Sequence, residues 1–178
     1  MDRSKPIYSV KSLYRMCNDL KNQGKRIGLT HGAFDLFHYS HLDLLQKAAA
    51  VCDFLIVGID NDESISKYKS YTRPIVNERQ RLGIVNELSC VDAVFIKDVP
   101  HDDESHIKLY KDLLTDYIII GSKFDSRFKE NIYNEAESIG VRLIEINAHQ
   151  DPTTTSIVNK IVERYSSEQY EDVPKSNY

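Results

Sequence analysis

The 178-residue chain has few cysteines and no long hydrophobic run. Cys17, Cys52 and Cys90 lie far apart and form no Cys-x-x-Cys pair, which argues against a zinc site of that type and predicts buried free thiols. No apolar stretch approaches the roughly 20 residues of a membrane span. The N-terminus also lacks the apolar core of a signal peptide. These absences lead us to expect a cytoplasmic protein without a membrane anchor.

Excess positive charge is missing as well. The 23 Lys and Arg residues against 27 Asp and Glu residues give a net charge of -4, so we expect no nucleic-acid partner and no membrane partner. A hydrophobic content of 41% can supply the core of one domain, which we place at residues 1–166. The polar stretch at residues 167–178 has no periodicity and is predicted to be a disordered tail.

Strand patterns alternate with helix patterns along the chain. Strands are predicted at residues 26–30, 53–60, 91–97, 116–121 and 141–147. Helices are predicted at residues 9–23, 41–52, 77–88, 102–114, 127–140 and 154–166, and residues 61–76 read as a loop with at most one helical turn. This alternation predicts an α/β fold with a doubly wound, parallel, five-stranded, Rossmann-like sheet.

The stretch "THGAFDLFHYSHL" joins the first predicted strand to the helix after it. A helix start attracts anions, and Gly32 lets the backbone approach a ligand closely. His38 and His41 would share one helix face, where they can donate hydrogen bonds to a triphosphate. Two other readings are a metal site with His31 as third ligand, and plain surface histidines. His106, further along the chain, is expected at a solvated helix start.

This stretch resembles the signature G-x-F-D-x-x-H-x-G-H of the cytidylyltransferase-like nucleotidyltransferases. The matching residues are Gly32, Phe34, Asp35, His38 and His41. The segments "TRPIVNERQRL" and "PTTTSIVNKI" extend the resemblance over residues 25–162. The pattern is closest to the adenylyltransferases of heptose 1-phosphate, and then to the glycerol-3-phosphate cytidylyltransferases.

The resemblance implies transfer of a nucleoside monophosphate from ATP or CTP to a phosphorylated sugar or polyol, with release of pyrophosphate. It assigns catalytic roles to His38, His41, Lys67 and Arg81, with Lys69 as a second choice beside Lys67. The implied nucleotide-binding residues are Thr30, Gly32, Ala33, Phe34, Asp35, Ser40, Gly121, Lys123, Thr153, Thr154 and Thr155. Mg²⁺ is expected to bridge the nucleotide phosphates rather than to occupy a protein site. A homodimer is expected because members of such families often dimerise.

Three departures from the family pattern bear on function. Ser40 replaces the glycine of the signature, and it can fit beside the nucleotide, donate to it or crowd it. Lys123 stands where a carboxylate is common, and "NAHQDPTTTS" lacks the arginine of many cytidylyltransferases, which favours ATP. These departures keep open a second hypothesis, a relative that binds nucleotide for sensing or scaffolding without catalysis.

Overall fold

The computed structural model describes residues 5–99, 102–122, 126–149 and 151–166. The strands are β1 (Ile27–Gly32), β2 (Phe54–Asp60), β3 (Ala93–Lys97), β4 (Tyr117–Gly121) and β5 (Arg142–Ile146). The helices are α1 (Val10–Asn22), α2 (Tyr39–Ala49), α3 (Asp62–Tyr68), α4 (Glu78–Asn86), α5 (Asp103–Asp112), α6 (Ser126–Ser138) and α7 (Thr154–Tyr165). All strand pairs are parallel, in the order β3-β2-β1-β4-β5. The predicted doubly wound five-stranded sheet is confirmed.

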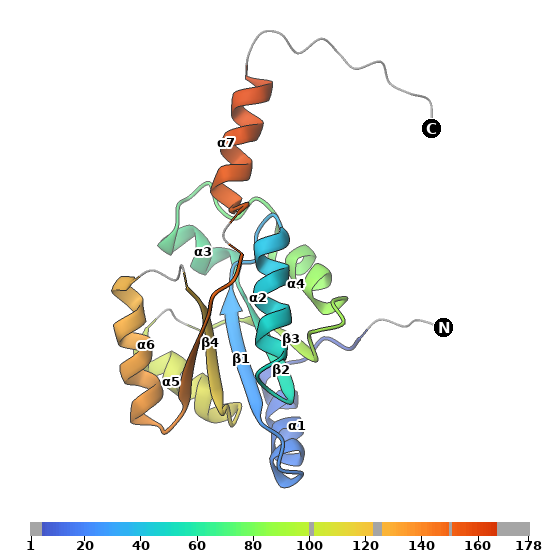
Figure 1. Cartoon of the computed structure of the whole chain (residues 1–178), viewed down its shortest axis with the longest axis vertical. Coiled ribbons are helices and arrows are strands. Elements are labelled where there is room, and N and C mark those ends of the chain that lie inside the picture. Colours follow the sequence, from blue (N-terminus) through green and yellow to red (C-terminus); the bar gives the residue numbers. More distant parts are fainter. Residues whose placement is uncertain (1–4, 100–101, 123–125, 150, 167–178) are drawn as a thin grey trace.

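Helices cover both faces of the sheet (Figure 1). Helices α1, α5 and α6 contribute to one apolar layer, to which Leu13 and Ile56 belong. Helices α2 and α4 contribute to the other, to which Leu45, Val57 and Val85 belong. Successive residues of β2 thus point to opposite layers, as the pleat of a strand requires. Burial on both faces explains why the central strands are continuous apolar runs in the sequence.

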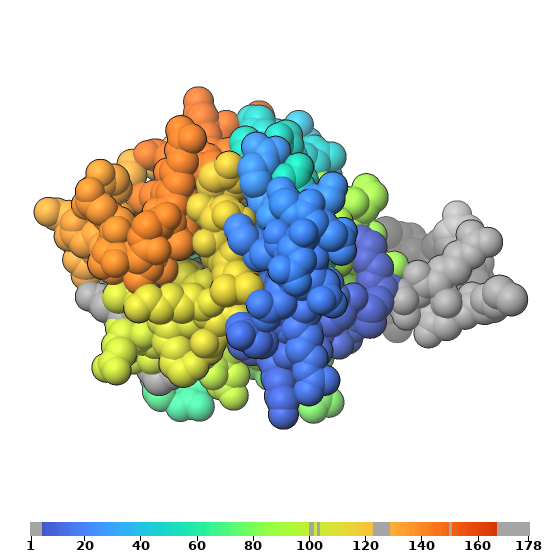
Figure 2. Space-filling model, turned by 90° about the horizontal axis from the view of Figure 1, so that it is seen from below, coloured from blue at the N-terminus to red at the C-terminus, as the bar shows by residue number. Residues whose placement is uncertain are grey.

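Helix α1 packs against the sheet rather than standing apart. Ser9 caps its start with a side-chain bond, and Gly24, with φ of +72°, follows its end. Lys21 pairs with Asp116, whose second oxygen accepts the backbone N–H of Ile27. In the view from below, the blue N-terminal residues lie against the yellow region around α5 and β4 (Figure 2). The N-terminal segment is therefore part of the same packed body.

The segment at residues 61–76 is more ordered than the sequence suggests. Helix α3 occupies two turns of it, and Asn61 caps this helix by accepting the N–H of Ser64. The helix buries only Ile65, so it leaves no periodic apolar signal in the sequence. Tertiary context, rather than amphipathic patterning, accounts for this difference.

The strand order reverses between β1 and β4, which places a crevice at the carboxyl edge of the sheet. Helix α7 starts at this edge and projects away from the body (Figure 1). Its residues Ile161 and Val162 are 48% and 57% exposed, so the body covers little of the helix beyond its first turns. Within the described ranges, no helix combines the length and apolar character needed to cross a membrane.

Candidate active site

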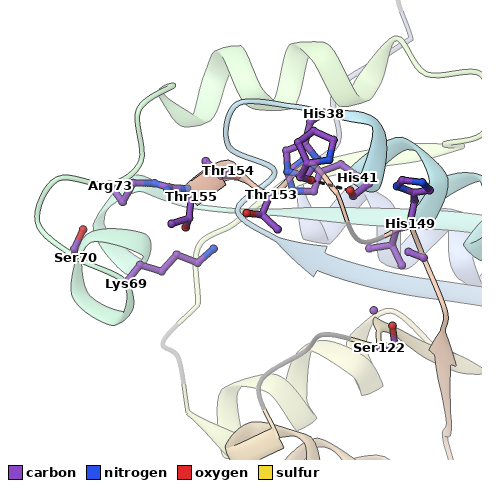
Figure 3. A pocket seen from close by; sticks show the side chains of 15 residues that line it. His38, His41, Lys69, Ser70, Arg73, Ser122, His149, Thr153, Thr154 and Thr155 are labelled. Atoms are coloured by element: carbon purple, nitrogen blue, oxygen red, sulfur yellow. Dashed lines mark hydrogen bonds between the residues drawn. The ribbon is translucent and has the colours of Figure 1, made fainter. Parts of the chain in front are cut away.

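A cavity of about 630 Å³ opens at the carboxyl edge of the sheet. Its walls come from the start of α2, from the segment after α3, from the end of β4, and from residues 148–149 and 152–155. In Figure 3, Lys69 and Arg73 lie on one side, His149 lies on the other, and the threonines of residues 153–155 lie between them. The ionisable lining residues are His38, His41, Lys69, Arg73 and His149. No carboxylate lines the described part of the cavity, so its chemistry suits an anionic ligand.

His38 and His41 form a stacked pair on the cavity wall. His38 is the N-cap residue of α2, and His41 lies in the first turn of that helix. Their ring centroids are 3.8 Å apart, and the ring planes differ by 21°. The Nδ1 atom of each ring is buried without a hydrogen-bond partner. Because buried polar atoms are normally paired, these two nitrogens show that the fold leaves hydrogen-bonding capacity of the histidine pair unmet at the cavity wall.

The pKa values of three basic groups at this wall are lowered, which means that their surroundings disfavour the protonated forms. Burial, followed by the charges of His38 and Lys69, lowers the pKa of His41 to about 3. Burial also lowers the pKa of His38. The pKa of Lys69 is lowered by desolvation and then by the nearby Arg73. The common direction indicates that a bound polyphosphate would relieve repulsion among these groups.

Asp35 ties two loops together behind the cavity. It is 1% exposed, and its carboxylate accepts the backbone N–H groups of Ile75 and Val76, each at 3.0 Å. Its Oδ2 atom also lies 2.8 Å from Nε of Arg73. Burial would raise the pKa of Asp35, but the backbone donors and Arg73 outweigh this effect and lower it. An ionised Asp35 therefore holds the segment that carries Arg73 against the loop between β1 and α2.

Ser40 and Thr154 attach the start of α7 to the same loop and helix. The Ser40 hydroxyl donates to the carbonyl of Pro152 at 2.8 Å, and the Thr154 hydroxyl donates to the carbonyl of Asp35 at 2.8 Å. Ser40 lies within α2, where a helical backbone does not require glycine. The serine that replaces the glycine of the signature thus has a structural partner and does not direct its hydroxyl at the cavity alone.

The remaining predicted nucleotide-binding residues divide into two groups. Further members that line the cavity are Gly121, Thr153 and Thr155. The lining does not include Thr30, Ala33 and Phe34, which are buried, or Gly32, which is half-buried. Among them, the Phe34 ring packs edge-on against His41 at a centroid distance of 5.4 Å and so supports the histidine pair. Lys123 lies outside the described residues.

Two predicted catalytic residues, Lys67 and Arg81, do not line the cavity. Lys67 is ion-paired within its own helix, and its side chain is 71% exposed. Lys69, the second choice in the sequence, lines the cavity instead. Arg81 is 1% exposed and donates to the carbonyl of Asp60 and the carboxylate of Asp62. In this structure Arg81 braces the corner between β2 and α3.

The prediction of a solvated position for His106 was wrong. His106 is 5% exposed, and its ring centroid lies 5.3 Å from that of His31. The Nε2 atom of His31 is 3.3 Å from the Tyr110 hydroxyl. The helical face of α5 that carries His106 and Tyr110 packs inward, which a short polar helix start did not indicate. Within the described residues, no group of three His, Cys, Asp or Glu side chains could hold a metal ion.

Comparison with protein families identifies the family to which the chain belongs. Residues 29–170 match the family model described as cytidylyltransferase-like. The match runs from β1 through α7 and so includes every wall of the cavity. The chain belongs to the cytidylyltransferase-like family of nucleotidyltransferases. The resemblance read from the histidine signature is thereby confirmed.

Curated relatives of this cytidylyltransferase-like chain are named Bifunctional protein HldE. The protein of Helicobacter pylori (strain J99 / ATCC 700824) is 36% identical over 154 residues, which are 85% of this chain and 31% of the relative. The protein of Syntrophotalea carbinolica is 32% identical over 147 residues, which are 82% of this chain and 29% of the relative. The chain therefore spans less than a third of the length of these relatives.

Solved structures share the fold of the family. A lipopolysaccharide core biosynthesis protein from Thermoplasma volcanium superposes with a TM-score of 0.59 at 23% identity. The superposition covers 71% of this chain and 100% of that protein. Pantoate-beta-alanine ligase from Francisella tularensis superposes with a TM-score of 0.61 at 20% identity, covering 93% and 80%. At these identities the likeness concerns the fold alone.

The resemblance to the cytidylyltransferase-like family implied a catalytic role for Arg81 and none for Arg73. The structure reverses their places, because the contact with Asp35 draws Arg73 to the cavity. A pairing over this separation leaves no local signal in the sequence. His149 and Ser122 also line the cavity.

Proposed function

We propose that this chain transfers a nucleoside monophosphate from ATP or CTP to a phosphorylated sugar or polyol and releases pyrophosphate. The product is an activated sugar or polyol nucleotide of the kind used for surface polysaccharide. Family membership supports nucleotidyl transfer. The relatives named HldE, together with the resemblance to heptose 1-phosphate adenylyltransferases, support a sugar phosphate as the acceptor.

One observation carries this proposal: the stacked pair of His38 and His41 faces a cavity whose described ionisable groups are all bases. The two buried Nδ1 atoms have no partner in the protein. Lys69 and Arg73 line the same cavity. A triphosphate supplies the acceptor oxygens and the negative charge that this arrangement leaves unmatched.

The reaction asks for positioning and charge stabilisation rather than for a covalent intermediate. A phosphate oxygen of the acceptor attacks the α-phosphorus of the nucleotide, and the bond to the leaving pyrophosphate breaks on the opposite side. Negative charge grows on the bridging and non-bridging oxygens during this step. The imidazole N–H groups of His38 and His41 donate to these oxygens, and fixed donors of this kind lower the barrier. Lys69 and Arg73 neutralise the departing pyrophosphate.

The start of α7 provides a second phosphate contact. Thr153 caps this helix, and Thr154 and Thr155 line the cavity at its first turn. The first N–H groups of a helix have no partner within the helix and carry partial positive charge. Phosphate oxygens bind well at such a terminus. The bonds from Ser40 and Thr154 keep this terminus at the cavity.

ATP is the nucleotide that we favour. Ala148 and Pro152 line the cavity beside His149, and the described residues of this loop include no arginine. The ring of Tyr39 lies edge-on to His149 at 5.1 Å, which gives this side an aromatic surface. A purine offers more stacking area to such a surface than a pyrimidine does.

Mg²⁺ accompanies nucleotides in reactions of this kind, where it binds between phosphate oxygens. The described lining has hydroxyl groups, imidazoles and cations but no carboxylate, so it fits an ion that the nucleotide carries rather than one that the protein holds. The lining also has hydroxyl oxygens that would serve as ligands to such an ion, from Ser122, Thr153 and Thr155. When bound, the ion supplies charge neutralisation at the phosphates.

Release of pyrophosphate tests the proposal directly. The full chain is incubated with ATP or CTP and with individual phosphorylated sugars and polyols, including heptose 1-phosphate and glycerol 3-phosphate. We expect pyrophosphate with one acceptor class, faster with ATP than with CTP, and none from a variant lacking both His38 and His41. Nucleotide binding without pyrophosphate for any acceptor would contradict transfer and support the sensing alternative.

A further inference from the structure

A buried ionic cluster lies behind the segment that carries Lys69. Asp60, at the end of β2, is 3% exposed, and Lys97, at the end of β3, is 0% exposed. The Lys97 Nζ atom lies 3.3 Å from Oδ1 of Asp60, and Nδ1 of His31 lies 3.6 Å from the same oxygen. The proposed transfer uses none of these three groups. Burying an aspartate and a lysine together is often no more stable than burying apolar residues, so stability alone does not account for this cluster.

Tyr68 connects this cluster to the cavity. Its hydroxyl donates to Oδ2 of Asp60 at 2.8 Å, so Asp60 faces the two bases with one oxygen and the tyrosine with the other. Tyr68 is the last residue of α3, and Lys69 follows it directly on the cavity wall. The Lys69 ammonium lies over the Tyr68 ring, 5.7 Å from its centroid, within the range of a cation–π contact. The hydroxyl thus fixes the ring, and the ring faces the ammonium group.

We propose that Tyr68 is a positioning residue, anchored by Asp60, that holds Lys69 at the phosphate-binding wall of the cavity. The inference rests on the proposed function, in which Lys69 binds phosphate. Helix α3 is only 7 residues long and buries Ile65 alone, so the helix by itself holds its end weakly. A free lysine side chain has many rotamers, and confining them before the ligand arrives makes binding tighter.

Binding of tripolyphosphate to the full chain, measured by calorimetry, tests this role without an acceptor or turnover. Lys69→Met sets the reference and should weaken binding about tenfold, as expected for loss of a charged contact. Tyr68→Phe keeps the ring and loses the hydroxyl, so it should weaken binding about threefold to fivefold. Tyr68→Leu loses both contacts and should approach Lys69→Met. Tyr71→Phe, on the same segment and 93% exposed in the parent, is the control and should leave binding unchanged.

A double variant separates positioning from general damage to the fold. Because Tyr68 acts through Lys69, the variant with both Tyr68→Leu and Lys69→Met should bind within about twofold of Lys69→Met alone. All titrations are run well below the lowest melting midpoint, so unfolding does not enter the comparison. The inference is overturned if the losses of tripolyphosphate affinity add in the double variant. It is also overturned if both Tyr68 variants bind tripolyphosphate like the parent while Lys69→Met binds it weakly.

The same data distinguish this inference from the proposed function. Parent-like binding by Lys69→Met would overturn the inference and the phosphate role of Lys69 together. Nucleotidyl transfer itself would still be decided by release of pyrophosphate. The converse result is that the parent releases pyrophosphate while Tyr68→Phe and Tyr68→Leu keep the parent's affinity for tripolyphosphate. That result would support the transfer reaction and overturn only the positioning role of Tyr68.

Discussion

Two pairs of histidine rings lie at the carboxyl edge of the sheet, and their surroundings are opposite. His38 and His41 stack at 3.8 Å beside the cavity, and each has a buried Nδ1 atom without a partner. His31 and His106 lie 5.3 Å apart inside the protein, where His31 faces the Tyr110 hydroxyl and the Asp60 carboxylate. The first pair is left incomplete by the fold, and the second is built into it.

The difference teaches that burial alone does not mark a functional histidine. Both pairs have buried ring atoms, but His38 and His41 line the cavity with an unpaired Nδ1 atom each, whereas His31 has partners inside the protein. Polar groups that stay unpaired cost stability and persist where binding supplies the partner. We therefore expect changes in the first pair to affect turnover and changes in the second to affect stability.

The largest expected effect is that of His41→Ala on turnover. Removing a fixed donor to the developing charge should raise the barrier by about 3 kcal/mol, which is a loss of more than 100-fold in kcat. The melting temperature should fall less than in His106→Ala, because the His41 ring is only half-buried and has an unpaired nitrogen in the parent. Rates of pyrophosphate release and a thermal melt check both statements. A variant with a near-normal rate would remove His41 from the reaction.

The matched change in the second pair is His106→Ala. It deletes a ring that is 5% exposed, so the free energy of unfolding should fall by roughly 2 to 3 kcal/mol through the cavity that remains. Urea unfolding measures this loss, and kcat at a temperature where the variant is folded should stay within a few-fold of the parent. A large loss of kcat with unchanged stability in His106→Ala would contradict the distinction between a functional and a structural histidine pair.

Acid should sharpen the same contrast. The pKa of His41 is about 3 in the folded chain, against an ordinary value of 6.5, so between these values the unfolded state binds more protons than the folded state. Stability therefore falls as pH falls through this window, by at most about 2 kcal/mol from pH 7 to pH 5. His38, whose pKa is also lowered, acts in the same direction. Unfolding of His41→Asn should depend less on pH than that of the parent, and equal slopes would contradict the assignment.

The smallest expected effect concerns the bond that holds α7 beside the first pair. Ser40→Ala removes the hydroxyl that donates to Pro152 and should weaken ATP binding by about 1 kcal/mol, roughly fivefold. Ser40→Gly removes it too and adds the entropic cost of glycine in a helix, so the loss should be slightly greater. Thermal-shift titrations with ATP measure both. Tighter binding by the glycine variant would mean that Ser40 crowds the nucleotide.

The sheet and its order of elements follow from the sequence because local patterns encode them. Apolar runs such as residues 54–59 remove their side chains from water only when both faces of the strand are buried. Helix caps such as Ser9 and Asn77 make their hydrogen bonds within their own helices. Helix α3 was not predicted at its full length from the sequence, because it buries only Ile65 and its position depends on contacts with distant residues. Dimerisation of the chain stays a prediction.

The site was predictable in its motif and less so in its cations. His38 and His41 line the cavity as the signature implied, because a single loop and helix start carry both. Lys67 and Lys69 differ by two positions on a short helix end, and only tertiary contacts decide which faces the cavity. Arg73 depends on Asp35, a partner in another loop. Pairings of this kind follow from the folded chain and not from spacing.

The bond from the Thr154 hydroxyl to the carbonyl of Asp35 joins residues that are 119 positions apart. Closing so long a loop carries an entropic cost, and the contact cannot form until the chain has been synthesised as far as the start of α7. A growing chain can therefore form β1 and the start of α2, with His38 and His41, while one wall of the cavity is still absent. Tight nucleotide binding therefore requires a chain that extends through the start of α7, because a chain that stops before Thr154 lacks one wall of the cavity.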